Sequence, residues 1–390
     1  MNLSAFGKKL SKNIQTYIII IALVAIWGVF AIVTKGGYIG PQNISNLFRQ
    51  MTVTGFLATG MVLVMVTGGI DLSVGKLAGF VSVVVALFQR DVWIKVIPNQ
   101  PILAAIFSII VGVIVGLLFG MYQAYIISYL RVPAFIVTLG GMFILNGGIL
   151  LATGGQTIAA NQPGFSFIAQ GYLPRVVGWI IGAAVVAILF VMMFANRRTK
   201  VKYGFKLKPI YQDLLQTTIF SLLVLVYVYI VNRYHGVQVP VLLLALTAIA
   251  VSYISTNTRF GRYAYAIGGN REAARLSGIN IKKQLFQVFA LMGLLCGIGG
   301  VVLASYVGYG TIAAGQGYEL DAIASCVLGG TSTLGGSGTI FGALVGALIM
   351  ASLNTGLQMM NVAPAWQYVL RGLVLVLAVI ADVYFKKSSN

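Results

Sequence analysis

Uncharged runs of about 20 residues recur along this chain of 390 residues and restrict the folds that it can adopt. A helix that crosses the hydrocarbon core of a bilayer needs about 20 predominantly apolar residues. Five runs have this length: Ile14–Thr34, Gln50–Ile70, Val176–Asn196, Leu214–Asn232 and Gly236–Thr258. Hydrophobic residues make up 59% of the chain and charged residues 8%, which excludes an ordinary soluble domain. We therefore predict an all-α, polytopic helical membrane protein.

The longer uncharged tracts have room for more than one crossing each. These tracts are 96–130, 132–174, 284–318 and 322–370. Twelve crossings is the upper count, with the segments at 14–34, 51–70, 76–89, 102–128, 134–153, 175–196, 214–232, 238–256, 284–305, 320–333, 338–358 and 365–384. The segments at 76–89 and 320–333 are short enough to be half-helices. We expect about 10–12 transmembrane segments in total.

The net charge of +19 raises the question of a nucleic-acid partner, and the placement of the charges argues against one. Basic residues gather in alternate connections, which is the pattern of cytoplasmic loops. With the amino terminus inside, this face holds Lys8, Lys9, Lys12, Arg131, Arg197, Arg198, Lys200, Lys202, Lys206, Lys208, six basic residues in 257–283, Lys386 and Lys387. We expect a membrane protein that contacts lipid and has both termini in the cytoplasm.

These segments form a single transmembrane domain over residues 1–390. Its expected parts are the first half of the spans (13–196), a basic cytoplasmic loop (197–213), additional spans (214–256), a cytoplasmic stretch (257–283) and the C-terminal spans (284–385).

The stretch 257–283 predicts a short exposed helix. Asn270 follows two glycines and is a good N-cap, and Glu272 falls in the first turn, where a carboxylate suits the helix dipole. Gly278 fits the C′ position, which needs a left-handed backbone, and Ile279 can supply the hydrophobic contact that follows. A helix this short is marginal alone in water, so it needs a surface to dock on.

Two glycine-flanked breaks carry acidic residues. Asp71 lies beside glycines between two apolar segments, and Glu319 and Asp321 lead a short apolar segment that ends in a glycine-rich turn. Carboxylates at membrane depth line a cavity or pair with a partner, and interrupted helices in two halves of a carrier indicate a transport pathway. Two interpretations of Asp71 have equal support. It is either a structural cap that accepts backbone N–H bonds at the start of the next helix, or a residue that contacts the transported solute directly.

Other glycines recur every four residues, at Gly112, Gly116 and Gly120, at Gly338, Gly342 and Gly346, and as the pair Gly293 and Gly297. Small-xxx-small stripes allow helix backbones to approach closely in lipid. The sequence leaves open whether these stripes pack internally or form a dimer seam.

Arg371 is the one basic residue placed inside a span, about 10 Å beyond Pro364 at 1.5 Å per residue. A guanidinium there must reach the interface, meet water or pair with an acid. Because the final span and the segment led by Glu319 and Asp321 start at the same face, we predict that Arg371 pairs with Asp321 or Glu319. The alternative is an arginine that snorkels to the outer interface.

No nucleotide or catalytic site is expected. The glycine-rich run at 329–338 contains no lysine, so it lacks the P-loop pattern, and the one histidine, His235, stands at the end of a span. We expect no enzyme activity, no metal site and no cofactor in this chain.

Several motifs together resemble the permease subunits of bacterial ATP-binding-cassette (ABC) importers for monosaccharides. They are Gly-Ile-Asp-Leu-Ser-Val-Gly at 69–75, Phe-Gly-Arg at 260–262 with Ala-Ile-Gly-Gly-Asn at 266–270, Glu-Ala-Ala-Arg-Leu-Ser-Gly-Ile at 272–279, Glu-Leu-Asp-Ala-Ile-Ala at 319–324 and Leu-Gly-Gly-Thr-Ser at 328–332. The similarity covers nearly the whole chain. The extra basic connection and span around Arg197–Asn232 look most like the xylose and multiple-sugar permeases.

The resemblance implies partners. Two permease subunits, expected here as a homodimer, form the pathway in the bacterial plasma membrane. Two ATPase subunits bind ATP in the cytoplasm, and a periplasmic or lipid-anchored binding protein delivers the sugar. The short helix is then the coupling helix that sits on the ATPase, formed by Asn270, Arg271, Glu272, Ala273, Ala274, Arg275, Leu276 and Gly278. For its arginines, pairing with acids of the ATPase competes with plain cytoplasmic charge.

We therefore expect the permease of an importer for xylose or several sugars. The alternative is a self-contained, proton-coupled secondary transporter or channel that uses Asp71, Glu319 or Asp321. Because a binding protein selects the sugar, we expect only weak contacts inside the pathway, from amide residues near Asn146, Gln156, Asn354 and Gln358.

Overall fold

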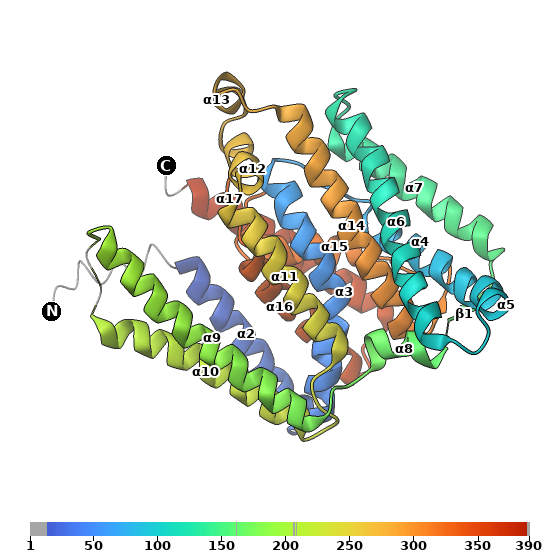
Figure 1. Ribbon diagram of the computed structural model, residues 1–390, viewed down its shortest axis with the longest axis horizontal. Helices are drawn as coiled ribbons and strands as arrows, with labels where there is room; N and C mark the ends of the chain where they lie inside the picture. The colour runs from blue at the N-terminus through green and yellow to red at the C-terminus, as the bar shows by residue number, and fades with distance from the viewer. Residues whose placement is uncertain (1–13, 161, 206, 208, 388–390) are drawn as a thin grey trace.

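The computed structural model describes residues 14–160, 162–205, 207 and 209–387, which form a bundle of helices (Figure 1). The longer helices are α2 (Ile14–Val33), α3 (Pro41–Val66), α4 (Val74–Leu87), α6 (Pro101–Ser128), α7 (Ala134–Thr153), α9 (Arg175–Lys202), α10 (Ile210–Asn232), α11 (Val239–Asn257), α12 (Arg259–Gly269), α14 (Ile281–Val307), α15 (Tyr318–Leu328), α16 (Ile340–Met359) and α17 (Pro364–Lys387). The short elements are η1 (Gly37–Ile39), η2 (Phe88–Trp93), α5 (Ile94–Val96), α8 (Pro163–Gln170), α13 (Arg271–Leu276) and the antiparallel strands β1 (Ile158–Ala159) and β2 (Tyr309–Gly310).

The helices confirm the polytopic architecture. Among the described residues, nine helical runs are long and apolar enough to cross a membrane, and apolar helices at Ile21–Val33 and Pro364–Ile380 add two shorter candidates. With 11 residues, α15 is about half as long as a full crossing, as the sequence suggested. The segment at 76–89 is different, because helix continues through η2 and α5 to form a run of 23 residues, Val74–Val96. It is therefore not a half-helix.

Two charged residues explain why that segment was read as too short. Arg90 and Asp91 interrupt the apolar pattern, but they pair with each other at 2.8 Å on the exposed side of a π-helical turn. Their charges are compensated locally, so the helix continues past them. The predicted basic loop at 197–213 is also shorter in the structure, since α9 extends to Lys202 and α10 begins at Ile210.

Helices α3 and α14 form the centre of the bundle. Their apolar windows are 83% and 78% buried, whereas those of α9 and α10 are only 17% buried. The outer helices therefore present continuous apolar faces, as expected for helices surrounded by lipid. Strand β1 lies in the connection after α7 and pairs with β2, which lies in the connection after α14.

The glycine stripes pack inside the subunit. Gly116 on α6 faces Gly293 and Gly297 on α14, and a Cβ at Gly116 would lie 2.5 Å from the carbonyl oxygen of Gly293. The later stripe behaves in the same way, because Gly346 on α16 lies against the backbone of Ser325 on α15. These contacts answer the question that the sequence left open, since both stripes serve close packing of helices within one chain.

This crossing makes a first prediction. We expect Gly116→Ala to lower the stability of the protein in detergent by about 1–3 kcal/mol, because the added methyl group meets backbone atoms that cannot move aside without shifting a helix. Gly140→Ala on α7 is the matched control, because no atom lies within 4 Å of the position that its Cβ would take. Thermal unfolding of the two purified variants measures the difference, and equal stabilities would contradict the close crossing.

One end of the bundle gathers the basic connections. Figure 1 shows α13 at the top of the molecule, and the end of α9, the start of α10 and the end of α17 toward its left side. Lys8, Lys9, Lys12, Lys206 and Lys208, which the sequence also assigned to this face, lie outside the described residues. At the end that carries α13, Arg271, Glu272 and Arg275 are exposed.

Candidate functional site

The ends of α13 are fixed by local hydrogen bonds, as the sequence predicted. The side-chain oxygen of Asn270 accepts the N–H of Ala273 at 2.9 Å, which completes the N-cap. At the other end Gly278 has a φ of +80°, and its N–H donates to the carbonyl of Arg275 at 3.0 Å. The N–H of Ile279 donates to the carbonyl of Ala274 at 3.1 Å. These two bonds form a Schellman motif, which explains the glycine.

The structure gives the length of α13 and an ion pair within it. The helix has six residues and is about 9 Å long. Arg275 forms an ion pair at 2.5 Å with Glu272 of the same helix, so its charge is compensated within the chain. The hydrogen bonds that the Arg275 guanidinium donates to the Glu272 carboxylate raise the pKa of Arg275.

The surface of α13 is open on most sides. Ala274 is buried, whereas Arg271, Glu272, Ala273, Arg275 and Leu276 are exposed. Leu276 has 75% of its surface accessible. A short, capped and exposed helix of this kind offers a ridge to a partner.

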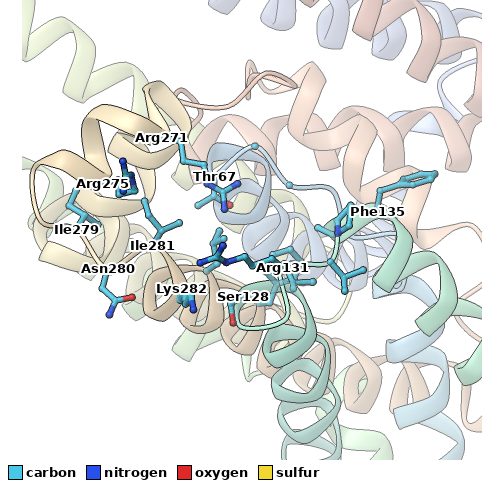
Figure 2. A pocket seen from close by; sticks show the side chains of 18 of the residues that line it. Thr67, Ser128, Arg131, Phe135, Arg271, Arg275, Ile279, Asn280, Ile281 and Lys282 are labelled. Atoms are coloured by element: carbon cyan, nitrogen blue, oxygen red, sulfur yellow. The ribbon is translucent and has the colours of Figure 1, made fainter.

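A cleft of about 1080 Å³ lies beside this ridge. Its walls come from α13, the start of α14, the connection between α6 and α7, and the residues that follow α3. Figure 2 shows Arg271 and Arg275 on one wall, with Arg131 and Ser128 contributed by the end of α6 and the connection after it. Among the described residues, the cleft is lined by the basic residues Arg131, Arg271, Arg275 and Lys282 and by one acid, Glu272.

Asp71 is buried and does not line this cleft. Its Oδ1 accepts the N–H of Ser73 at 2.8 Å and the hydroxyl of Ser73 at 2.7 Å. The same hydroxyl oxygen lies 3.1 Å from Oε1 of Gln123 on α6. These contacts support the alternative in which Asp71 is a structural cap at the start of α4.

The predicted partner of Arg371 is confirmed. Nη1 of Arg371 lies 3.5 Å from Oδ2 of Asp321, and its Nε donates to Oδ1 of Asn354 at 2.8 Å. Nδ2 of Asn354 lies 3.5 Å from the same carboxylate oxygen, so the three residues join α15, α16 and α17. Glu319 instead faces α4, where a Cβ at Gly75 would collide with its carboxylate.

The four predicted pathway residues fall into two groups. Asn354 and Gln358 are one turn apart on α16, and Oε1 of Gln358 lies 3.5 Å from Nε2 of Gln50. Asn146 is half-buried on α7, and Gln156 is exposed in the turn after that helix. None of the four lines the cleft beside α13. Their role in a pathway stays a prediction.

Sequence reasoning missed the juxtaposition of Arg131 with α13. Arg131 was assigned only to the cytoplasmic face, and its position in the cleft depends on packing between segments about 140 residues apart. Its left-handed backbone, with a φ of +60°, has no sequence signal of the kind that glycine gives.

Comparison with known proteins agrees with this architecture. Residues 43–379 match the family described as branched-chain amino acid transport system / permease component. A xylose transport system permease protein of Haemophilus influenzae is 41% identical over 97% of this chain and 98% of its own length. A ribose import permease protein of Escherichia coli is 32% identical over 93% of this chain and 92% of its own. A galactose/methyl galactoside import permease protein of Salmonella typhimurium is 32% identical, with 94% and 92% covered.

No solved structure matches the chain. The family match runs from the first turn of α3 into α17 and includes both acidic breaks and α13. The chain therefore belongs to this family of transport-system permease components.

Proposed function

We propose that this chain is the membrane-spanning permease subunit of an ABC importer that moves a monosaccharide, xylose or several sugars, into the cytoplasm. The three relatives described above are named for xylose, ribose and galactose transport, and each aligns over more than nine-tenths of both chains. These names favour a sugar over the branched-chain amino acids in the description of the family.

The observation that carries the proposal is the exposed α13. It is capped at both ends by its own residues and presents Leu276 and Arg271 outward. In the proposed complex it is the coupling helix of the permease and docks on an ATPase subunit, which binds the ATP. Two copies of the permease and an extracytoplasmic binding protein complete the importer. The end that carries α13 faces the cytoplasm, in keeping with its basic residues.

The acidic breaks have different roles in this proposal. Asp71 holds the start of α4, and Asp321 holds α17 through Arg371. Neither carboxylate is required to carry a proton, because ATP hydrolysis by the partner drives the cycle. Asn354 and Gln358 are the better placed of the proposed pathway residues, since they belong to the polar group that connects α3, α15, α16 and α17.

Uptake in reconstituted vesicles tests the proposal. The permease, the ATPase and the binding protein of the same transporter are reconstituted, and radiolabelled xylose, ribose and galactose are supplied in turn. We expect uptake of at least one sugar that requires ATP and persists when an ionophore collapses the membrane potential. Uptake that follows the potential and ignores ATP would instead identify a secondary carrier. The permease with a non-hydrolysing ATPase variant is the control.

A further inference from the structure

We infer that the cleft beside α13 receives an acidic segment of the ATPase subunit, and that Arg131 is a second contact with that partner outside the coupling helix. This inference rests on the proposed function. It adds the connection between α6 and α7 to a contact surface that would otherwise consist of α13 alone.

The shape of the site requires something in the cleft. Residues of α13 line one side of the cleft, so a partner that docks on α13 also meets the opening of the cleft. A partner that left the cleft empty would leave about 1080 Å³ of space in the interface. Specific protein interfaces are packed about as densely as protein interiors, which favours a filled cleft.

The charge of the cleft defines the chemistry of the segment. Within the described part of the chain, Arg131, Arg271 and Lys282 make no ion pair or side-chain hydrogen bond. Arg275 is neutralised by Glu272. Three uncompensated cations therefore surround one cavity, and carboxylates are the side chains that complement them.

The backbone of Arg131 is a separate indication. Its φ of +60° lies in the left-handed region, where an L-residue with a Cβ is strained and glycine is not. Strain of this kind concentrates at functional positions. Lys35, Asn99 and Asn361 share this conformation, so the backbone supports a role for Arg131 only together with its place in the cleft.

The residues that follow α3 extend the contact toward the membrane helices. Residues 67–70 line the cleft and directly precede Asp71 and the start of α4. A segment that fills the cleft would touch the break between α3 and α4 as well as α13. Movement of the ATPase would then reach the membrane helices at two places.

Cysteine labelling measures whether the cleft is filled. The two native cysteines, Cys296 and Cys326, are fully buried, so introduced thiols can be labelled selectively. Val132→Cys places a thiol in the cleft, and Leu130→Cys places one on an exposed residue nearby that does not line it. In inside-out vesicles, we expect added ATPase to slow maleimide labelling of Val132→Cys and to leave Leu130→Cys unchanged. Equal labelling with and without ATPase at Val132→Cys would overturn the inference.

A second measurement isolates the guanidinium. Arg131→Gly removes the side chain and relieves the backbone strain, so a loss cannot be explained by a poorly folded loop. We expect it to weaken ATPase binding about tenfold, the effect of losing a hydrogen bond to a charged group, and Arg131→Lys to retain part of the affinity. Lys35→Gly is the matched control, because Lys35 has a φ of +52° in the turn after α2.

The outcomes separate this inference from the proposed function. If Gly278→Val weakens ATPase binding and Arg131→Gly does not, α13 is the coupling helix and the inference about the cleft is wrong. If neither variant weakens binding, the assignment of α13 as the coupling helix and the inference about the cleft are both wrong. Protection of Val132→Cys by vesicles rich in anionic phospholipid, without ATPase, would assign the cleft to lipid headgroups and also overturn the inference.

Discussion

Replacing Gly278 by valine is expected to reduce ATP-driven sugar uptake at least tenfold while the permease inserts at normal abundance. Gly278 has a φ of +80°, and a β-branched residue there is strained by roughly 1–2 kcal/mol. A Cβ at this position would meet no atom within 4 Å, so the strain comes from the backbone and not from a collision. It acts on the Schellman bonds of Gly278 and Ile279, which hold the end of α13 in the form that the ATPase recognises.

The control uses a neighbouring glycine. A Cβ at Gly269 would also have no atom within 4 Å, but the φ of Gly269 is not positive. We expect Gly269→Ala to retain uptake close to that of the unmodified protein. Uptake is measured in vesicles and normalised to the amount of permease detected by immunoblot. Normal uptake by Gly278→Val would refute the assignment of α13 as the coupling helix.

Neutralising either partner of the pair between Arg371 and Asp321 is expected to destabilise the protein by about 3–5 kcal/mol, because each change leaves a buried charge without its counter-ion. The side chain of Asp321 is 5% exposed and that of Arg371 is 18% exposed, so water compensates little. Arg371→Met and Asp321→Asn should each lower the unfolding temperature and the amount of folded permease. The double variant should recover part of the loss, since no unpaired charge remains.

Glu319 provides the comparison for the single and double variants of Asp321 and Arg371. It belongs to the same first turn of α15 but faces α4, away from Arg371. Combining Glu319→Gln with Arg371→Met should therefore give a smaller coupling than combining Asp321→Asn with Arg371→Met, because Glu319 makes no ion pair with Arg371. Strictly additive losses for Asp321 and Arg371 would show that the ion pair contributes no coupling energy.

Local signals explain why α13 could be predicted almost residue by residue. Asn270 and Gly278 fix its ends through bonds to atoms no more than five residues away, so the sequence contains all the necessary information. The pairing of Arg371 with Asp321 was also accessible, because a charge at membrane depth has few available partners. The spans could be predicted from length and hydropathy because a helix that crosses the bilayer needs about 20 predominantly apolar residues.

Long-range packing explains what the sequence did not reveal. The stripe of Gly112, Gly116 and Gly120 indicates a close approach without naming the approaching helix, which is α14. The cleft depends on the same kind of information, because Arg131 and Lys282 meet only after α6 and α14 have packed. The continuation of helix past Arg90 and Asp91 was missed because their mutual ion pair is a feature of side-chain geometry.

The crossing of α6 and α14 also constrains the order in which the protein assembles during synthesis. About 150 residues separate the end of α6 from the start of α14. At roughly 5–20 residues per second, a ribosome needs on the order of 10–30 s to make them. For that time α6 is already in the bilayer, while the backbone that its glycines will touch does not yet exist. The stripe of Gly112, Gly116 and Gly120 is therefore the surface of the nascent chain that lipid or an insertion chaperone must cover until α14 arrives.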